Sequence, residues 1–153
     1  MLEPKAASAT IDDIEVGEGI VIEKTVSESD VYGFAGITGD LAPNHINERY
    51  MKKSIYGTRI AQGALILGFT SAASAMYSVQ RGIDGVALGY DRVRFTGAVK
   101  FGDTIRIEYR ITRVDKEAQR TYAEVEITNQ DGKTVLVCTH VLKFLPYGGS
   151  EEE

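Results

Sequence analysis

Apolar and polar residues alternate in two segments of the second half of the chain, 105–111 and 123–127. Such alternation predicts strands with one buried and one solvated face. An Asp-Gly pair at 131–132 favours a hairpin turn after the second segment. A longer, largely apolar strand is expected over 135–145, and an irregular extended segment over 86–95. The pattern therefore predicts four consecutive antiparallel strands.

The first half of the chain reads as one strand followed by short helices. The strand is expected at 20–26, where valine and isoleucine dominate. Ser27 can cap the helix that follows, and Gly39 can end it. A loop is expected over 40–45, and a second short helix over 48–53.

Between these halves lies a segment, 60–80, that contains no charged residue. It is long enough to span a bilayer, but its hydropathy is mild and it is rich in serine and alanine. We therefore predict a helix buried inside the protein, from about Gly63 to Gln80 and ended by Gly82. Because it is apolar nearly all round, it should be covered on most faces. A long helix wrapped by an antiparallel sheet is the α+β hot-dog arrangement.

The chain has 153 residues, which fits a single domain with a core over about 14–145. We expect a loose arm over 1–12, with no signal peptide, and an acidic tail over 146–153. The net charge of −5 makes nucleic acid a poor partner. The single cysteine, Cys138, allows no internal disulfide and suits the cytoplasm. One cysteine and two histidines argue against a metal site.

The candidate chemistry lies in the loop that joins the two short helices. Asp40 and His45 stand five residues apart, and Pro43 fixes one backbone angle between them. A rigid loop can aim both side chains at one small volume, where they can hold a water molecule and move its protons. Alone, each residue is better explained as a turn residue or a structural histidine. Together with Gly63 downstream, the set favours catalysis.

Gly63 begins the long predicted helix. The first N–H groups of a helix have no partner within it, and glycine lets a substrate come close. These N–H groups can stabilise a carbonyl oxygen that gains negative charge. An acid, a base and such an oxyanion site suit the addition of water beside a thioester carbonyl.

The run Thr38-Gly-Asp-Leu-Ala-Pro-Asn-His45, followed by Arg59-Ile-Ala-Gln-Gly63, resembles the hydratase signature of the MaoC-like, (R)-specific enoyl-CoA hydratases. The resemblance covers about 14–145. It implies a homodimer of hot-dog subunits, with acyl-CoA bound in a tunnel beside the central helix. It implies reversible syn addition of water to a trans-2-enoyl-CoA, which gives the (R)-3-hydroxyacyl-CoA. The CoA thioester is the substrate, and no cofactor is implied.

By the same resemblance, Asp40 and His45 activate the water, and the Gly63 N–H polarises the thioester carbonyl. Ser71 matches a serine found near the site in some members, although it is better explained as a small core-facing residue. Gln62 stands where the family usually has histidine, and it is assigned to substrate binding. Two further departures are Ala42, in place of the family's asparagine, and Asn44, where many members have an apolar residue.

Two other functions fit the same fold. Hot-dog thioesterases usually place a carboxylate on or near the central helix, and 60–80 contains none. A non-catalytic acyl-CoA-binding or partner subunit would be expected to have lost Asp40 or His45, and this chain keeps both. The other histidine, His140, is predicted to be structural, with Cys138 and Leu142 beside it in the core.

Overall fold

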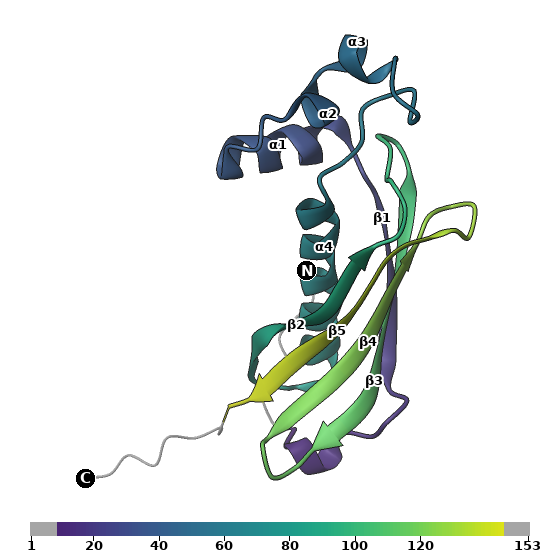
Figure 1. The fold of residues 1–153 in the computed structure, drawn as a ribbon. Helices are drawn as coiled ribbons and strands as arrows, with labels where there is room; N and C mark the ends of the chain where they lie inside the picture. Colours follow the sequence, from purple (N-terminus) through teal and green to yellow (C-terminus); the bar gives the residue numbers. More distant parts are fainter. Residues whose placement is uncertain (1–8, 146–153) are drawn as a thin grey trace.

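The computed structural model describes residues 9–145, and its elements follow the predicted order (Figure 1). They are a short 3-10 turn η1 (Ile11–Asp13), strand β1 (Gly19–Thr25), helices α1 (Glu28–Thr38), α2 (Pro43–Ile46), α3 (Glu48–Met51) and α4 (Gly63–Arg81), and strands β2 (Gly85–Phe95), β3 (Thr104–Asp115), β4 (Arg120–Thr128) and β5 (Thr134–Phe144). All five predicted strands and the long helix are confirmed. The prediction of a loop over 40–45 is wrong in its second half, because helix α2 begins at Pro43.

The five strands form one antiparallel sheet in the order β1-β3-β4-β5-β2. The sheet is curved, and α4 lies along its concave face (Figure 1). The predicted α+β hot-dog arrangement is therefore confirmed. Strands β1 and β2 are the two edges, so β2 pairs on one side only within this chain.

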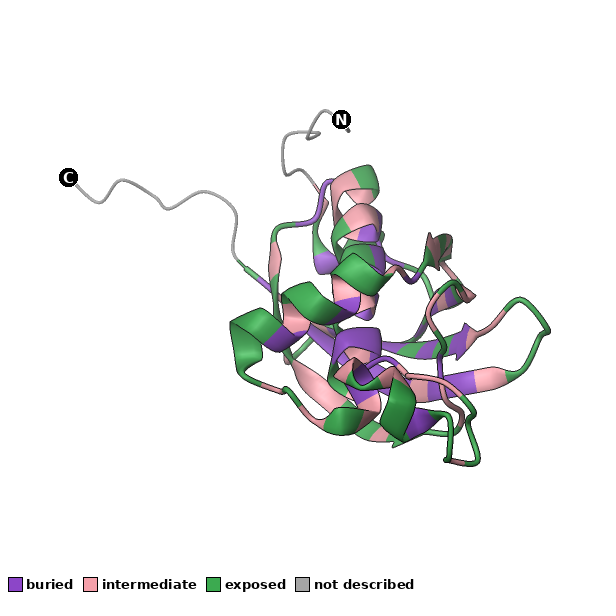
Figure 2. Ribbon diagram, turned by 90° about the horizontal axis from the view of Figure 1, so that it is seen from above, coloured by how far each residue is buried: buried purple, intermediate pink, exposed green. Residues whose placement is uncertain are grey.

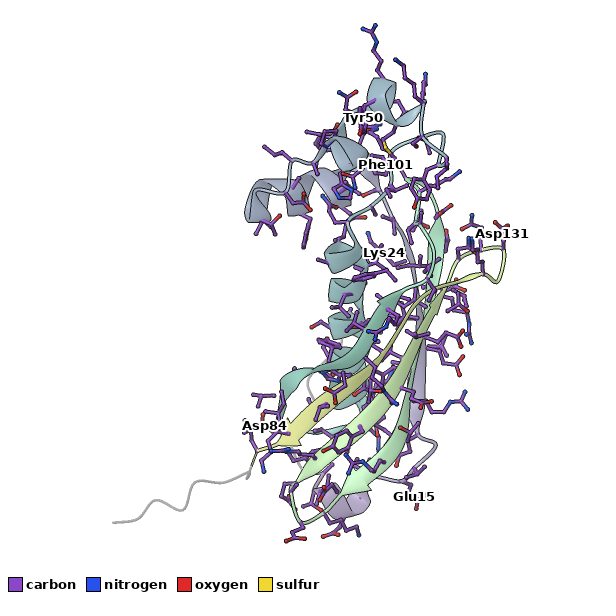
Figure 3. All side chains as sticks on the ribbon, in the orientation of Figure 1. Glu15, Lys24, Tyr50, Asp84, Phe101 and Asp131 are labelled. Atoms are coloured by element: carbon purple, nitrogen blue, oxygen red, sulfur yellow. The ribbon has the colours of Figure 1, made fainter. Side chains whose placement is uncertain are left out.

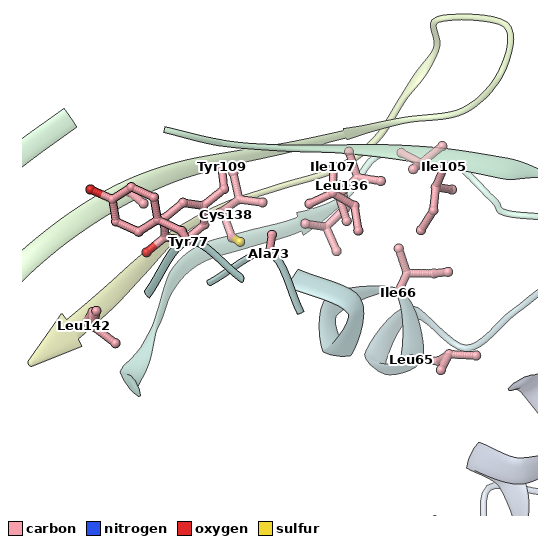
Figure 4. Close-up of a cluster of buried hydrophobic side chains, with 14 of the residues drawn as sticks. Leu65, Ile66, Ala73, Tyr77, Ile105, Ile107, Tyr109, Leu136, Cys138 and Leu142 are labelled. Carbon is pink, nitrogen blue, oxygen red and sulfur yellow. The ribbon is translucent and has the colours of Figure 1, made fainter. Parts of the chain in front are cut away.

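The core lies between α4 and the inner face of the sheet (Figure 4). Alternate residues of β3 point inward, which the sequence pattern predicted. The inward residues, each at most 1% exposed, are Ile105, Ile107, Tyr109 and Ile111. On the helix, Ile66, Ala73 and Tyr77 face them and are at most 3% exposed. Ala73 is small, which lets the sheet approach the helix closely.

Most faces of α4 are covered, as its apolar sequence predicts, but one face is not. Within the single chain this face is exposed, and its residues are all small: Ala64, Gly68, Ser71, Ala72 and Ala75. Ser71, which was expected to face the core, is therefore exposed in the single chain. Exposed residues also dominate the outer turns of the fold, whereas buried residues gather toward its middle (Figure 2).

Helices α1 to α3 form a separate layer over the N-terminal end of α4 (Figure 1). The Ser27 hydroxyl accepts a hydrogen bond from the Asp30 N–H, and the Asp30 carboxylate accepts one from the Ser27 N–H. The capping box is thus complete. Gly39 ends α1 with φ 78°, a left-handed conformation that suits glycine.

The first described residues of the chain pack against the core through Ala9 and Ile11. The prediction of a loose arm over 1–12 is wrong at its C-terminal end, because Ile11 is 2% exposed and lies in η1. The remainder of that arm and the expected acidic tail lie outside the described residues. Within residues 9–145, no helix combines the length and hydropathy needed to cross a membrane.

His140 is buried as predicted, at 1% exposed, and its Nδ1 lies 3.1 Å from the Tyr109 hydroxyl. Burial lowers the pKa of His140 from 6.5 to about 4. The unfolded chain therefore takes up a proton at higher pH than the folded chain does. We expect the free energy of unfolding to fall between about pH 6.5 and pH 4, by roughly 3 kcal/mol at the acid end.

Urea unfolding across this pH range measures that loss. The variant His140→Gln keeps a hydrogen-bonding group beside Tyr109 but cannot titrate. Its free energy of unfolding should change less with pH than that of the wild type. An identical pH dependence in both proteins would assign the loss to other groups.

Candidate active site

His45 is held in one orientation by the strand-like segment that precedes α4. Its side chain is largely buried, and Nδ1 lies 2.7 Å from the carbonyl oxygen of Ile60. A carbonyl oxygen only accepts hydrogen bonds, so Nδ1 carries a proton, and in the neutral ring Nε2 is the acceptor nitrogen. The Ile60 N–H in turn donates to the Asn44 carbonyl at 3.0 Å. These contacts fix the orientation of the imidazole, with Nδ1 turned to Ile60 and Nε2 on the other side of the ring.

Asp40 lies beside that nitrogen. Its Oδ2 is 3.7 Å from His45 Nε2, which is too long for a direct hydrogen bond. Both atoms are acceptors, so a donor such as a water molecule can bridge them. The Asp40 side chain is 41% exposed and the His45 side chain 9%. Asp40 is steadied by the Ala42 N–H, which donates to Oδ1 at 3.4 Å.

Gly63 and His45 line the same cavity, which has a volume of about 480 Å³. Gln62 is the N-cap residue of α4, but its side chain makes no capping hydrogen bond to the helix. Of the first four N–H groups of α4, only that of Ile66 finds an acceptor among residues 9–145, the Gln62 carbonyl. The N–H groups of Gly63 and its two successors are thus available to a ligand.

Gly63 also lies close to an aromatic ring. A Cβ added to Gly63 would lie 3.0–3.1 Å from three carbons of the Phe95 ring. Phe95 is 55% exposed, so its ring can shift to make room. We expect Gly63→Ala to keep the fold but to lower kcat for thioester substrates by roughly 10- to 100-fold. The added methyl group would crowd the Gly63 N–H, which is expected to polarise the thioester carbonyl.

Thermal unfolding and steady-state kinetics together test this expectation. Gly33→Ala is the matched control, because Gly33 lies within helix α1, is exposed, has no heavy atom within 4 Å of an added Cβ, and does not line the cavity. Activity of Gly63→Ala equal to that of Gly33→Ala would exclude a role for the Gly63 N–H.

Two other residues expected at the site lie elsewhere in the single chain. Gln62 is 1% exposed, and its Nε2 donates to the Val31 carbonyl of α1 at 3.2 Å. Its Oε1 is buried and has no hydrogen-bond partner among residues 9–145. Neither Gln62 nor Ser71 lines the cavity that holds His45. The structure thus brings His45 and Gly63 to one cavity and Asp40 to His45, whereas Gln62 and Ser71 do not line that cavity.

Sequence reasoning missed a charged residue that supports the site. Arg59 precedes Ile60, and its side chain pairs with Glu28 of α1 and Glu48 of α3. Its guanidinium also stacks on Phe101, 4.6 Å from the ring centre, and Figure 3 shows Phe101 near the layer of α1 to α3. Arg59 therefore ties that layer to the segment that holds His45. Its position at the edge of the charge-free segment was the available signal.

No group of three or more His, Cys, Asp or Glu side chains suited to a metal ion occurs within residues 9–145. The groups at the site that suit this chemistry include one carboxylate, one imidazole and backbone N–H groups. Such a set supports proton transfer and stabilisation of an oxyanion.

The chain is similar to known proteins in both sequence and fold. The family described as "MaoC like domain" matches residues 14–133. An (R)-specific enoyl-CoA hydratase from Rhodospirillum rubrum is 36% identical over 101 residues, which cover 66% of this chain and 68% of that protein. A 3-hydroxybutyryl-CoA dehydratase from Methylorubrum extorquens is 29% identical over 143 residues, which cover 94% of this chain and 88% of that protein.

Among solved structures, the unliganded R-hydratase PhaJ1 from Pseudomonas aeruginosa superposes with a TM-score of 0.73 and 26% identity, covering 94% of this chain and 93% of that one. The fold and the Asp–His loop define a hot-dog protein of the hydratase and dehydratase class. The chain belongs to the MaoC-like dehydratase family.

Proposed function

We propose that the chain is an enoyl-CoA hydratase and 3-hydroxyacyl-CoA dehydratase. It adds water reversibly to a trans-2-enoyl thioester and forms the (R)-3-hydroxyacyl thioester. The observation that carries this proposal is the arrangement of His45, which lines one cavity with Gly63 at the start of α4 and has its Nε2 3.7 Å from Oδ2 of Asp40. These groups supply a pair that can accept a proton and a site that can stabilise an oxyanion.

Each residue then has one role in the addition. A water molecule donates hydrogen bonds to Asp40 and to His45 Nε2. As its oxygen forms a bond to C3, one proton passes to the Asp40–His45 pair. Electrons of the double bond move to the thioester oxygen, which the Gly63 N–H stabilises as an enolate. The pair returns the proton to C2 on the same face, so the atoms of one water are added in the syn sense.

The activities named for two relatives support this proposal. The Rhodospirillum rubrum protein is an (R)-specific enoyl-CoA hydratase, and the Methylorubrum extorquens protein is a 3-hydroxybutyryl-CoA dehydratase. The two names describe opposite directions of the same type of reaction. A cytoplasmic site of action is part of the proposal and suits the buried thiol of Cys138, whose pKa burial raises to about 11.

A second copy of the chain is the proposed partner. The unpaired edge strand β2 exposes three large apolar side chains, Val86, Leu88 and Phe95, which are 44–55% exposed. The uncovered face of α4 is made of small residues, which permit close packing. Edge strands with exposed apolar residues invite pairing with another chain. In such a homodimer the acyl-CoA would lie beside α4, and the partner would cover part of the site.

Hydration of crotonyl-CoA tests the function. The enoyl-thioester absorbance should decrease when the wild-type protein is added, and chiral analysis should identify (R)-3-hydroxybutyryl-CoA as the product. Release of free CoA thiol without hydration would instead indicate a thioesterase. The lack of any acidic residue in α4 argues against that outcome. Binding of the thioester without either reaction would indicate a non-catalytic subunit.

A further inference from the structure

Asn44 makes an unusual contact with the reacting nitrogen of His45. Its side-chain Nδ2 lies 3.2 Å from His45 Nε2. With Nδ1 donating to the Ile60 carbonyl, Nε2 of the neutral ring accepts, and the amide nitrogen of Asn44 is the group that faces it. Asn44 is half-buried and lines the same cavity as His45 and Gly63.

This contact competes with the reaction. An imidazole nitrogen has one lone pair and accepts one good hydrogen bond. A water molecule that is activated by Nε2 must therefore displace the Asn44 amide. Once displaced, the amide loses its partner while the bound acyl group covers it. A polar group that is buried without a partner costs free energy, so the amide needs a new acceptor.

The cavity offers a second donor but no carboxylate. Lys133 is the single charged side chain among the residues that line it, and no carboxylate pairs with Lys133 within residues 9–145. Lys133 follows the turn of the β4–β5 hairpin, whose position is marked by Asp131 in Figure 3. Asn44 and Lys133 are both suited to donate to oxygen. A plain alkyl chain would satisfy neither of them.

We propose that Asn44 is a specificity-determining residue that selects enoyl thioesters with an acceptor oxygen on the acyl group next to the double bond, such as a hydroxyl or a carboxylate. The inference rests on the proposed function for its reaction. In the free protein Asn44 is hydrogen-bonded to His45. In the complex it donates to the acyl oxygen, and His45 Nε2 is released to the water. A site built to hydrogen-bond a substrate oxygen discriminates against the analogue that lacks it.

Two matched pairs of thioesters test the proposal. The reacting pair is crotonyl-CoA, which carries a methyl group next to the double bond, and fumaryl mono-CoA, which carries a carboxylate there. A third substrate, 4-hydroxycrotonyl-CoA, supplies an acceptor oxygen without a charge. The non-reacting pair is butyryl-CoA and succinyl-CoA, whose dissociation constants calorimetry measures. We expect the wild type to prefer the oxygen-bearing member of each pair by about tenfold or more. Asn44→Leu should remove or reverse that preference, with better use of crotonyl-CoA.

The control is Asn47→Ala, because Asn47 caps α3 and does not line the cavity. It should keep the wild-type preference. Lys133→Gln separates charge from hydrogen bonding: it should weaken the preference for the carboxylate but not for the hydroxyl. Equal losses for both members of a pair would mean that Lys133 contacts the shared CoA portion, and would remove it from the proposal.

The outcomes separate this inference from the proposed function. If crotonyl-CoA is hydrated and Asn44→Leu leaves every preference unchanged, the role of Asn44 is overturned and the hydratase function stands. If no thioester is hydrated but the calorimetric preference depends on Asn44, the reaction is wrong and the binding role of Asn44 stands.

Discussion

Asp40→Asn is expected to lower kcat for hydration of crotonyl-CoA by roughly 10³-fold or more, with a much smaller change in KM. The substitution keeps the size of the side chain and the acceptor for the Ala42 N–H, but the amide cannot take a proton from water. The Asp40 side chain is 41% exposed, so its replacement should not disturb the core. Stopped-flow or steady-state measurement of enoyl-thioester absorbance gives both constants.

The matched control is Asp131→Asn, at the tip of the β4–β5 hairpin (Figure 3). That change removes the same charge away from the cavity, and kcat should stay within about twofold of the wild type. If Asp40→Asn were as active as this control, Asp40 would be a turn residue and the proposed mechanism would fail.

His45→Gln is expected to have a comparable effect, a loss of roughly 10²- to 10⁴-fold in kcat, because no titratable acceptor remains beside Asp40. It should also destabilise the fold moderately, by about 1–3 kcal/mol, since the bond from Nδ1 to the Ile60 carbonyl is lost and that carbonyl is left without its donor. Denaturant unfolding and kinetics on the folded protein measure the two effects separately.

His45→Asn distinguishes the two roles of the ring. An asparagine amide can reach the position of Nδ1, so it can keep the bond to Ile60, but it has no atom at the position of Nε2. It should be closer to the wild type in stability than His45→Gln is, and just as inactive. Recovery of activity in His45→Asn would show that His45 acts only through its contact with Ile60.

The sequence was sufficient for those parts of the fold that depend on local patterns. Alternation in β3 and β4 predicted their inner faces, and the charge-free segment predicted α4 with its Gly82 end. Pro43 also carried a signal for α2, since proline is favoured at the first position of a helix. That signal was masked because the segment 40–45 is short and rich in turn residues.

The features that sequence reasoning did not predict depend on the environment of a residue. Ser71 lies on a helix that is apolar nearly all round, and no periodicity indicates which face the sheet leaves open. Gln62 was assigned by its place next to Gly63. Its side chain turns toward Val31 of α1, a contact between segments far apart in the sequence. Asn44 was visible only as a departure from the family pattern, and its contact with His45 follows from the geometry of α2.

The most direct test of the central claim compares the double variant Asp40→Asn/His45→Gln with its two single variants in crotonyl-CoA hydration. Residues that act together on one water lose most of their effect when either is removed. We therefore predict that the double variant is about as slow as the slower single variant. Losses that multiply, so that the double variant is slower by the product of the two single effects, would contradict a shared water and with it the proposed site.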